Sequence, residues 1–250
     1  MDAWIDTYHT VRGLTRAGTY VFLTDSAVGA PEEDNLRHLV TNLGTDVARE
    51  RIVPFLTTKH SLEYCVSYAE RAQQHGFPSL VVLGGDKAVG APRVVEHAWQ
   101  LRGTLRSREP RLTLGGWANP HADAERQIDF LTAANFNAEY FLTQVVSHHD
   151  QKAVDQFMAA ASRRGLTLPG VFGVFYYRSA NRKTLTVLRD FLPVPVDGLV
   201  EDFASGASPE AVCAKTIRLL RAAGVRHFYI SNLPIGRAPR VLSDILSQSE

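Results

Sequence analysis

Polar residues follow seven short apolar runs in this 250-residue sequence, and these are the residues whose types suit chemistry. They include two carboxylates, Asp25 and Asp86, and two carboxamides, Gln144 and Asn232. A carboxylate accepts hydrogen bonds from N–H groups, and a carboxamide both donates and accepts. The set therefore suits a ring-bearing, hydrogen-bonding small molecule. It contains neither the paired carboxylates of a glycosidase nor a nucleophile beside a base.

Aromatic and histidine side chains occur at similar positions. Tyr176 and Tyr177 could stack on a planar heteroaromatic ligand, or they could simply cover the core. His121 is a candidate contact to a phosphate or a ring. The pair His148-His149 predicts a solvated loop, because neighbours in sequence rarely point at one ion. We therefore expect no metal site.

The apolar runs predict the elements that must position these residues. Each run is apolar almost throughout, as in strands buried on both faces of a parallel sheet, and a longer segment of helical pattern follows each one. Most runs begin about 30 residues apart, which is the size of a βα unit. The runs are residues 19–24, 52–56, 79–83, 112–117, 139–144, 170–175 and 226–231.

This alternation predicts one domain over residues 1–250 with the α/β fold of a TIM-type (β/α)₈ barrel. Such a barrel needs eight strands. Either residues 194–199 supply a weak eighth strand, or the first strand is lacking or replaced, since Asp2–Arg16 has the pattern of an amphipathic helix. In a barrel the active site forms at the carboxyl ends of the strands, which is where the polar residues lie.

Composition excludes several classes of protein. The 27 basic and 26 acidic residues give a net charge of +1, so nothing favours a nucleic-acid partner or an anionic membrane surface. No apolar stretch approaches the roughly 18 residues of a membrane span. Two cysteines, Cys65 and Cys213, cannot form a disulfide framework. These features are typical of a cytoplasmic protein.

Six short segments occur in an order and spacing that is more specific than any one of them. They are Thr24-Asp25-Ser26-Ala27, Leu83-Gly84-Gly85-Asp86, Asn119-Pro120-His121, Phe141-Leu142-Thr143-Gln144, Pro169-Gly170-Val171, and His227-Phe228-Tyr229 with Asn232. Together they resemble motifs of the methylenetetrahydrofolate reductase family, from about Thr19 to the C-terminus.

The resemblance implies a barrel that reduces 5,10-methylenetetrahydrofolate to 5-methyltetrahydrofolate by hydride transfer. In family terms Asp86 would hold the pterin ring, and Gln144 would contact the folate near the reacting carbon. We expect further substrate contacts from three residues and contacts to the nicotinamide dinucleotide from three others. These are Tyr176, Tyr177 and Asn232 for the substrate, and Thr24, Thr57 and His121 for the dinucleotide.

Departures from the family pattern decide the expected cofactor. Flavin-dependent members carry a basic pair that grips the FAD phosphates, and the matching positions here are Thr132 and Ala133. Gly84 stands where the family has an arginine. Because these cationic contacts are lost, the resemblance is closer to the flavin-independent mycobacterial type, and we expect NADH or NADPH rather than FAD.

The family's proton donor is a glutamate on the first strand, and this sequence begins at what resembles the following helix. Asp25, Asp86 and Glu201 are candidate substitutes for that acid. Two alternatives stay open. One is a one-carbon transferase that uses the same folate, and the other is a non-catalytic folate-binding subunit. In the second case a partner chain or another copy of this chain would complete the barrel.

Overall fold

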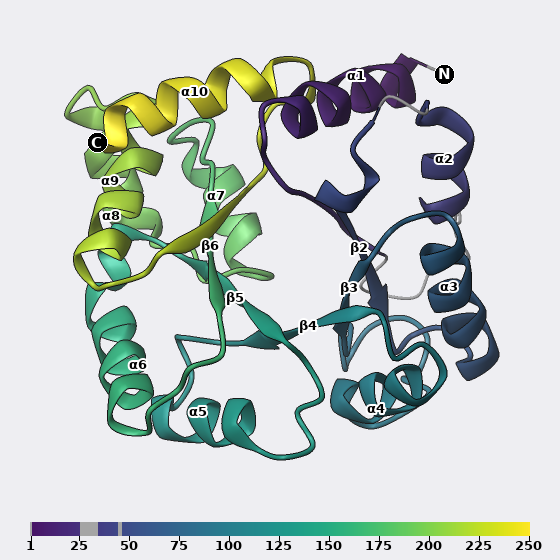
Figure 1. Ribbon diagram of the computed structural model, residues 1–250. Coiled ribbons are helices and arrows are strands. Elements are labelled where there is room, and N and C mark those ends of the chain that lie inside the picture. Colours follow the sequence, from purple (N-terminus) through teal and green to yellow (C-terminus); the bar gives the residue numbers. More distant parts are fainter. Residues whose placement is uncertain (1, 26–34, 45–46) are drawn as a thin grey trace. The chain divides into compact units, whose positions relative to one another are not determined.

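The computed structural model describes residues 2–25, 35–44 and 47–250 of the chain (Figure 1). Within these ranges seven parallel strands alternate with helices, which is the α/β alternation of TIM-like folds. The chain divides into two compact units. One extends to Gly116 and includes Ala133–Tyr140, and the other comprises Trp117–Thr132 and Phe141–Glu250.

The first unit is a parallel sheet in the order β1-β2-β3-β4 with helices beside it. Val21 pairs with Ile52 across β1 and β2, and Phe55 pairs with Val81 across β2 and β3. Its elements are α1 (Asp2–Arg16), β1 (Val21–Leu23), α2 (Asn35–Asn42), the 3₁₀ turn η1 (Arg49–Arg51), β2 (Ile52–Thr57), α3 (Leu62–Gln74), β3 (Ser79–Leu83), α4 (Ala98–Arg108) and the start of β4 (Thr113–Ala118).

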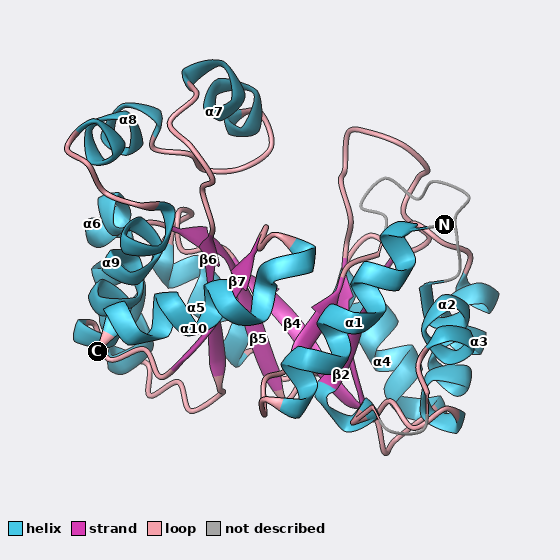
Figure 2. Ribbon diagram, turned by 90° about the horizontal axis from the view of Figure 1, so that it is seen from above, coloured by secondary structure: helices cyan, strands magenta, loops and turns pink. Residues whose placement is uncertain are grey.

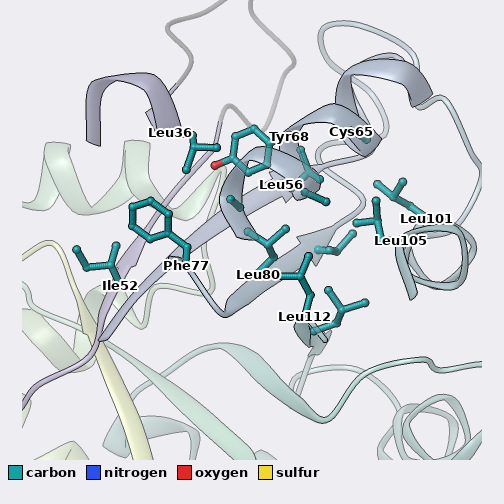
Figure 3. Packing of buried hydrophobic residues seen from close by; sticks show 14 of the residues in the cluster. Leu36, Ile52, Leu56, Cys65, Tyr68, Phe77, Leu80, Leu101, Leu105 and Leu112 are labelled. Carbon is teal, nitrogen blue, oxygen red and sulfur yellow. The ribbon is translucent and has the colours of Figure 1, made fainter. Parts of the chain in front are cut away.

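The core of the first unit lies between β2, β3 and the helices α3 and α4 (Figure 3). All six residues of β2 are buried, because the strand is covered on both faces. Helix α3 contributes Cys65, Tyr68, Ala69 and Ala72, which are spaced as one face of an α-helix. This packing fixes the carboxyl ends of β2 and β3, where the polar residues begin.

The second unit is a parallel sheet in the order β5-β6-β7. Two extra helices, α7 and α8, lie beyond the carboxyl end of β6 (Figure 2). Its elements are the end of β4, α5 (Ala124–Thr132), β5 (Tyr140–Val146), the 3₁₀ turn η2 (His148–Asp150), α6 (Gln151–Arg163), β6 (Gly170–Phe175), α7 (Arg182–Arg189), α8 (Val196–Ala204), α9 (Pro209–Ala222), β7 (His227–Ser231), the 3₁₀ turn η3 (Ile235–Arg237) and α10 (Ala238–Ser249).

All seven apolar runs form strands, so this part of the prediction is confirmed. The helix predicted over Asp2–Arg16 has these bounds in the structure. Ser208 caps α9 by accepting a hydrogen bond from the Ala211 amide, with Pro209 at the first helical position. The turns after α1, α3, α6 and α9 each contain a glycine with positive φ, the conformation in which glycine commonly ends a helix.

The prediction of an eighth strand at residues 194–199 is wrong, because α8 begins at Val196. Val196, Leu199, Val200 and Phe203 follow helical spacing and pack in one apolar cluster with Leu185 of α7. Asp197 lies in the first turn of α8, where a negative charge stabilises a helix. A six-residue window is too short to distinguish this helical spacing from a strand.

No helix within the described ranges is long and apolar enough to cross a membrane. Cys65 and Cys213 are both buried free thiols. Burial raises the pKa of each thiol to about 12, so both stay protonated and unreactive at neutral pH.

Candidate functional site

In the first unit, Asp25 organises the carboxyl ends of β1 and β2. Its Oδ2 accepts hydrogen bonds from the Thr57 amide at 2.8 Å and from the Thr57 hydroxyl at 3.0 Å. The same oxygen lies 2.8 Å from Nε2 of His60. Asp25 therefore acts as a hydrogen-bond acceptor that orients a histidine. This role differs from that of a proton donor.

His60 is a functional candidate to which the sequence alone assigns no role. Its side chain is 15% exposed, and its ring lies 4.6 Å from the Tyr64 ring, centroid to centroid. With Nε2 directed at Asp25, Nδ1 has no hydrogen-bond partner among the residues that the structure describes. A histidine held by a carboxylate in this way can pass a proton through its other nitrogen. The signal in the sequence was its position three residues after β2, opposite an aspartate that follows β1.

The loop between β3 and α4 carries Asp86 and is held by the end of β2. The Thr58 hydroxyl donates to the Gly84 carbonyl, and Lys59 donates from Nζ to the Val89 and Ala91 carbonyls. Asp86 Oδ1 accepts hydrogen bonds from the amides of Ala88 and Val89, which lower the pKa of this exposed carboxyl. The second carboxylate oxygen of Asp86 is thus presented, in ionised form, from an anchored loop.

Arg93 brings a cation to the same loop beside Gly84, at the position where the family that the sequence resembles has an arginine. A Cβ added at Gly84 would lie 2.7 Å from Cζ of Arg93, so the guanidinium occupies the space beside the Gly84 backbone. Arg93 also donates a hydrogen bond to the Gly85 carbonyl. The charge that sequence comparison counted as lost is therefore present nearby, contributed by a residue nine positions later.

In the second unit, β5 is irregular at the residues predicted to contact substrate. Leu142 pairs with Val171, but the register shifts before Val145 pairs with Gly173. The Thr143 hydroxyl replaces the missing ladder contact by accepting from the Gly173 amide at 3.0 Å. Gln144 folds back so that its Oε1 accepts from the Val145 amide. Such bulges re-aim side chains and are frequent beside active sites.

Gly173 is required by the packing around this bulge. The Tyr229 hydroxyl donates to the Thr143 carbonyl at 2.7 Å, and a Cβ on Gly173 would lie 2.5 Å from that hydroxyl oxygen. Gly173→Ala is expected to displace Tyr229 and to lower the free energy of unfolding by about 1–3 kcal/mol. Chemical denaturation measures the change. Gly236→Ala is the control, because a Cβ there meets no atom within 4 Å; equal stability of the two variants would contradict the expectation.

The other residues predicted to contact substrate or cofactor form hydrogen bonds or apolar contacts within the protein. His121 Nε2 lies 2.9 Å from the Val145 carbonyl oxygen. Tyr176 is buried, and its hydroxyl donates to Glu210 at 2.6 Å, while Tyr177 is buried in the apolar cluster of α7 and α8. Asn232 has a φ of +66° and donates from its side-chain nitrogen to the Tyr176 carbonyl.

Four further residues named from the sequence lie at the surface or outside the described part. Thr24 follows β1 and is exposed. Glu201 is exposed on α8. Ser26 and Ala27, which carry part of the family resemblance, lie outside the residues that the structure describes.

The prediction that His148 and His149 form a solvated loop is wrong. Both Nε2 atoms lie 2.8 Å from Oδ2 of Asp202, and the two ring centroids are 4.1 Å apart. The His148 side chain is only 5% exposed, and those of Asp202 and His149 are 12% and 29% exposed. The rings converge because η2 is a tight 3₁₀ turn after β5 and because α8, inserted after β6, supplies the carboxylate. Neither feature is visible from the sequence spacing.

Three local features hold this His148–His149–Asp202 cluster in place. Ser147 caps η2, with the Asp150 carboxylate accepting from the Ser147 amide at 2.8 Å. Gly198 leaves room for the His149 ring, since a Cβ there would lie 2.5 Å from its Cε1. Lys215 of α9 donates from Nζ to the other oxygen of Asp202 at 3.1 Å.

Burial and neighbouring charges set the protonation states of His148 and Asp202. Burial and the neighbouring His149 lower the pKa of His148 to about 4, although Asp202 opposes the shift. Burial raises the pKa of Asp202, but hydrogen bonds from His149 and Lys215 outweigh it, so the net shift is downward. His148 is therefore neutral and Asp202 ionised at neutral pH.

Comparisons with known proteins identify structural neighbours. No family model matches the chain, and no curated protein matches its sequence. The structure of PhdJ bound to a substrate intermediate is 12% identical and covers 98% of this chain and 88% of that one, with a TM-score of 0.47. A putative dihydrodipicolinate synthetase from Pseudomonas aeruginosa is 12% identical over 99% of this chain and 93% of that one, with a TM-score of 0.44.

A stronger likeness is to an uncharacterized protein from Clostridium thermocellum, whose structure is described as binding two copies of 5-methyl-5,6,7,8-tetrahydrofolic acid. The two chains are 14% identical, and the alignment covers 97% of this chain and 88% of the other, with a TM-score of 0.61. At this identity the likeness is one of fold. The chain therefore shares its fold, over almost its whole length, with a protein that binds a reduced folate.

Proposed function

We propose that this protein binds a reduced folate through the polar residues at the carboxyl ends of its strands. The observation that carries the proposal is the shared fold with the folate-binding neighbour, over 97% of the chain. The order of the sequence motifs supports it independently. A pterin offers an amino group and a ring N–H side by side, and a carboxylate is the side chain that accepts from both.

Asp86 is the residue we assign to the pterin. Its Oδ1 is held by two backbone amides, its loop is anchored by Thr58 and Lys59, and its charge is maintained by the lowered pKa. The side chain is exposed, so the remaining oxygen is accessible to a ligand. A group that is already positioned and ionised loses little entropy when a ligand binds to it.

We further propose that the protein reduces 5,10-methylenetetrahydrofolate, with NADH or NADPH as the hydride source and without FAD. A proton on N10 opens the five-membered ring and leaves a methylene iminium on N5, which a hydride converts to the methyl group. His60, oriented by Asp25, is the candidate proton donor.

Asp86→Asn tests the pterin assignment. Asparagine keeps the shape of the side chain but replaces one acceptor oxygen by a donor, which faces the pterin N–H groups. We expect the Kd for 5-methyltetrahydrofolate to rise by roughly 5- to 150-fold, the cost of one unmatched polar contact of 1–3 kcal/mol. Isothermal titration calorimetry measures it, with Asp123→Asn, an exposed aspartate at the start of α5, as the control.

Turnover is tested separately by following NADH oxidation with methylenetetrahydrofolate. Oxidation coupled to formation of 5-methyltetrahydrofolate is the expected result. Binding of folate without NADH or NADPH oxidation would reject the reductase step and leave a folate-binding protein. An unchanged Kd in Asp86→Asn would remove Asp86 from the site, and Gln144→Ala is the corresponding test of the carboxamide.

A further inference from the structure

The His148–His149–Asp202 cluster lies where α/β proteins of this kind place functional groups. His148 and His149 follow the carboxyl end of β5, and Asp202 lies on a helix inserted after the carboxyl end of β6 (Figure 2). Nothing in the proposed folate chemistry uses these three side chains. The cluster therefore needs an explanation of its own.

We propose that these three residues bind a divalent transition metal of the Zn²⁺ class. One ligand atom from each residue lies within 4.8 Å of the other two, which is close enough for a single ion to contact all three. Two imidazole nitrogens and one carboxylate oxygen are a donor set that suits zinc and its neighbours better than Ca²⁺ or Mg²⁺. Three protein ligands leave a coordination position for water or a substrate atom.

The surroundings of His148 resemble those of a histidine that binds a metal ion. Its Nδ1 lies 3.2 Å from the Thr216 hydroxyl oxygen, and that hydroxyl lies 3.3 Å from the Val212 carbonyl. The Thr216 hydroxyl can thus accept a hydrogen bond from Nδ1–H while it donates its own hydrogen bond to the Val212 carbonyl. This leaves a lone pair on Nε2, directed at the position between the ligands.

Burial and access also fit an exchangeable ion. His148 and Asp202 are almost covered, so a bound cation would be largely shielded from water on their side. The His149 side chain is more exposed, so an ion would reach the cluster from its side. In the absence of an ion the ammonium group of Lys215 offsets part of the charge on Asp202. Because that ammonium repels a cation, Lys215 lowers the affinity of the site for a metal ion. Substitution of Lys215 therefore tests the site.

Zn²⁺ titration of the untagged full chain, after treatment with a chelator, tests the proposal. We expect one Zn²⁺ per chain and a loss of affinity of at least about 100-fold in Asp202→Asn. Gly198→Ala changes no ligand but pushes the His149 ring aside, so it should also weaken binding. Lys215→Gln should tighten binding by roughly fivefold. His227→Ala, an exposed histidine of the same unit, is the matched control and should bind as the wild type does.

Co²⁺ provides a readout that does not depend on stability. Co²⁺ bound by two imidazoles and a carboxylate gives visible absorption bands, and these should be present in the wild type and absent in Asp202→Asn. Circular dichroism without metal confirms that each variant is folded. The same Zn²⁺ affinity in wild type, Asp202→Asn and Gly198→Ala, or an equal loss in His227→Ala, would overturn the proposal. Because the probe is the metal alone, the outcome is independent of folate binding.

Discussion

Replacing His60 with alanine is expected to lower the rate of methylenetetrahydrofolate reduction by roughly 10²–10⁴-fold, the usual contribution of a general acid. The reason is the geometry after β2, where Asp25 fixes Nε2 of His60 and the other ring nitrogen has no partner among the described residues. Binding of 5-methyltetrahydrofolate should be much less affected, because the pterin assignment rests on Asp86. Steady-state kinetics of NADH oxidation measures the change as a fall in kcat.

Added imidazole separates a chemical role of His60 from a structural one. Partial rescue of His60→Ala by imidazole is expected only if the ring carries a proton in the reaction. Asp25→Asn should reduce kcat less than His60→Ala, since Asp25 acts through the position of His60. His9→Ala, an exposed histidine on α1, is the matched control. A kcat of His60→Ala equal to that of the control would contradict the assignment.

Arg102→Ala is expected to lower the free energy of unfolding by about 3 kcal/mol or more. Arg102 is 3% exposed on α4, and it donates to the Phe136 carbonyl from Nε at 2.8 Å and to the Val82 carbonyl from Nη1 at 3.1 Å. Its guanidinium carbon also lies 4.6 Å from the centre of the Phe136 ring. Alanine leaves two buried carbonyls without these donors and opens a cavity.

Two variants distinguish the causes of this loss. Burial lowers the pKa of Arg102 to about 10, so the side chain stays charged at neutral pH, and its loss removes a cation as well as packing. Arg102→Met keeps the apolar stem and should recover part of the stability. Arg108→Ala, an exposed arginine of the same helix, should change it by no more than about 0.5 kcal/mol. Urea denaturation gives the values; equal effects at Arg102 and Arg108 would contradict this account.

Much of the fold could be predicted because its signals are local. Apolar runs such as residues 79–83 and 170–175 have the same bounds in the structure, since a strand covered on both faces must be apolar along its length. The segment 194–199 failed for the opposite reason. Its apolar residues continue into α8 at helical spacing, and what they pack against is a neighbouring helix, α7, rather than another strand.

The candidate site could be predicted only as single residues, because their partners are far away in the sequence. Asp25 was found, but its role depends on His60, which is 35 residues away. His148 and His149 were assigned to solvent, although Asp202, more than 50 residues later, draws both rings together. Glycines are a further sequence signal of close packing at the candidate site. Gly173 and Gly198 mark places where the Tyr229 hydroxyl and the His149 ring approach the backbone.

Calorimetric titration of the wild-type chain with 5-methyltetrahydrofolate tests the central claim most directly. The account predicts saturable binding with a fixed stoichiometry and a negative heat-capacity change, since a ring system is buried on binding. The p-aminobenzoylglutamate half of the ligand, which lacks the pterin, should bind far more weakly. Absence of saturable binding, or equal affinity for the ligand with and without its pterin, would contradict the claim that this protein recognises a reduced folate.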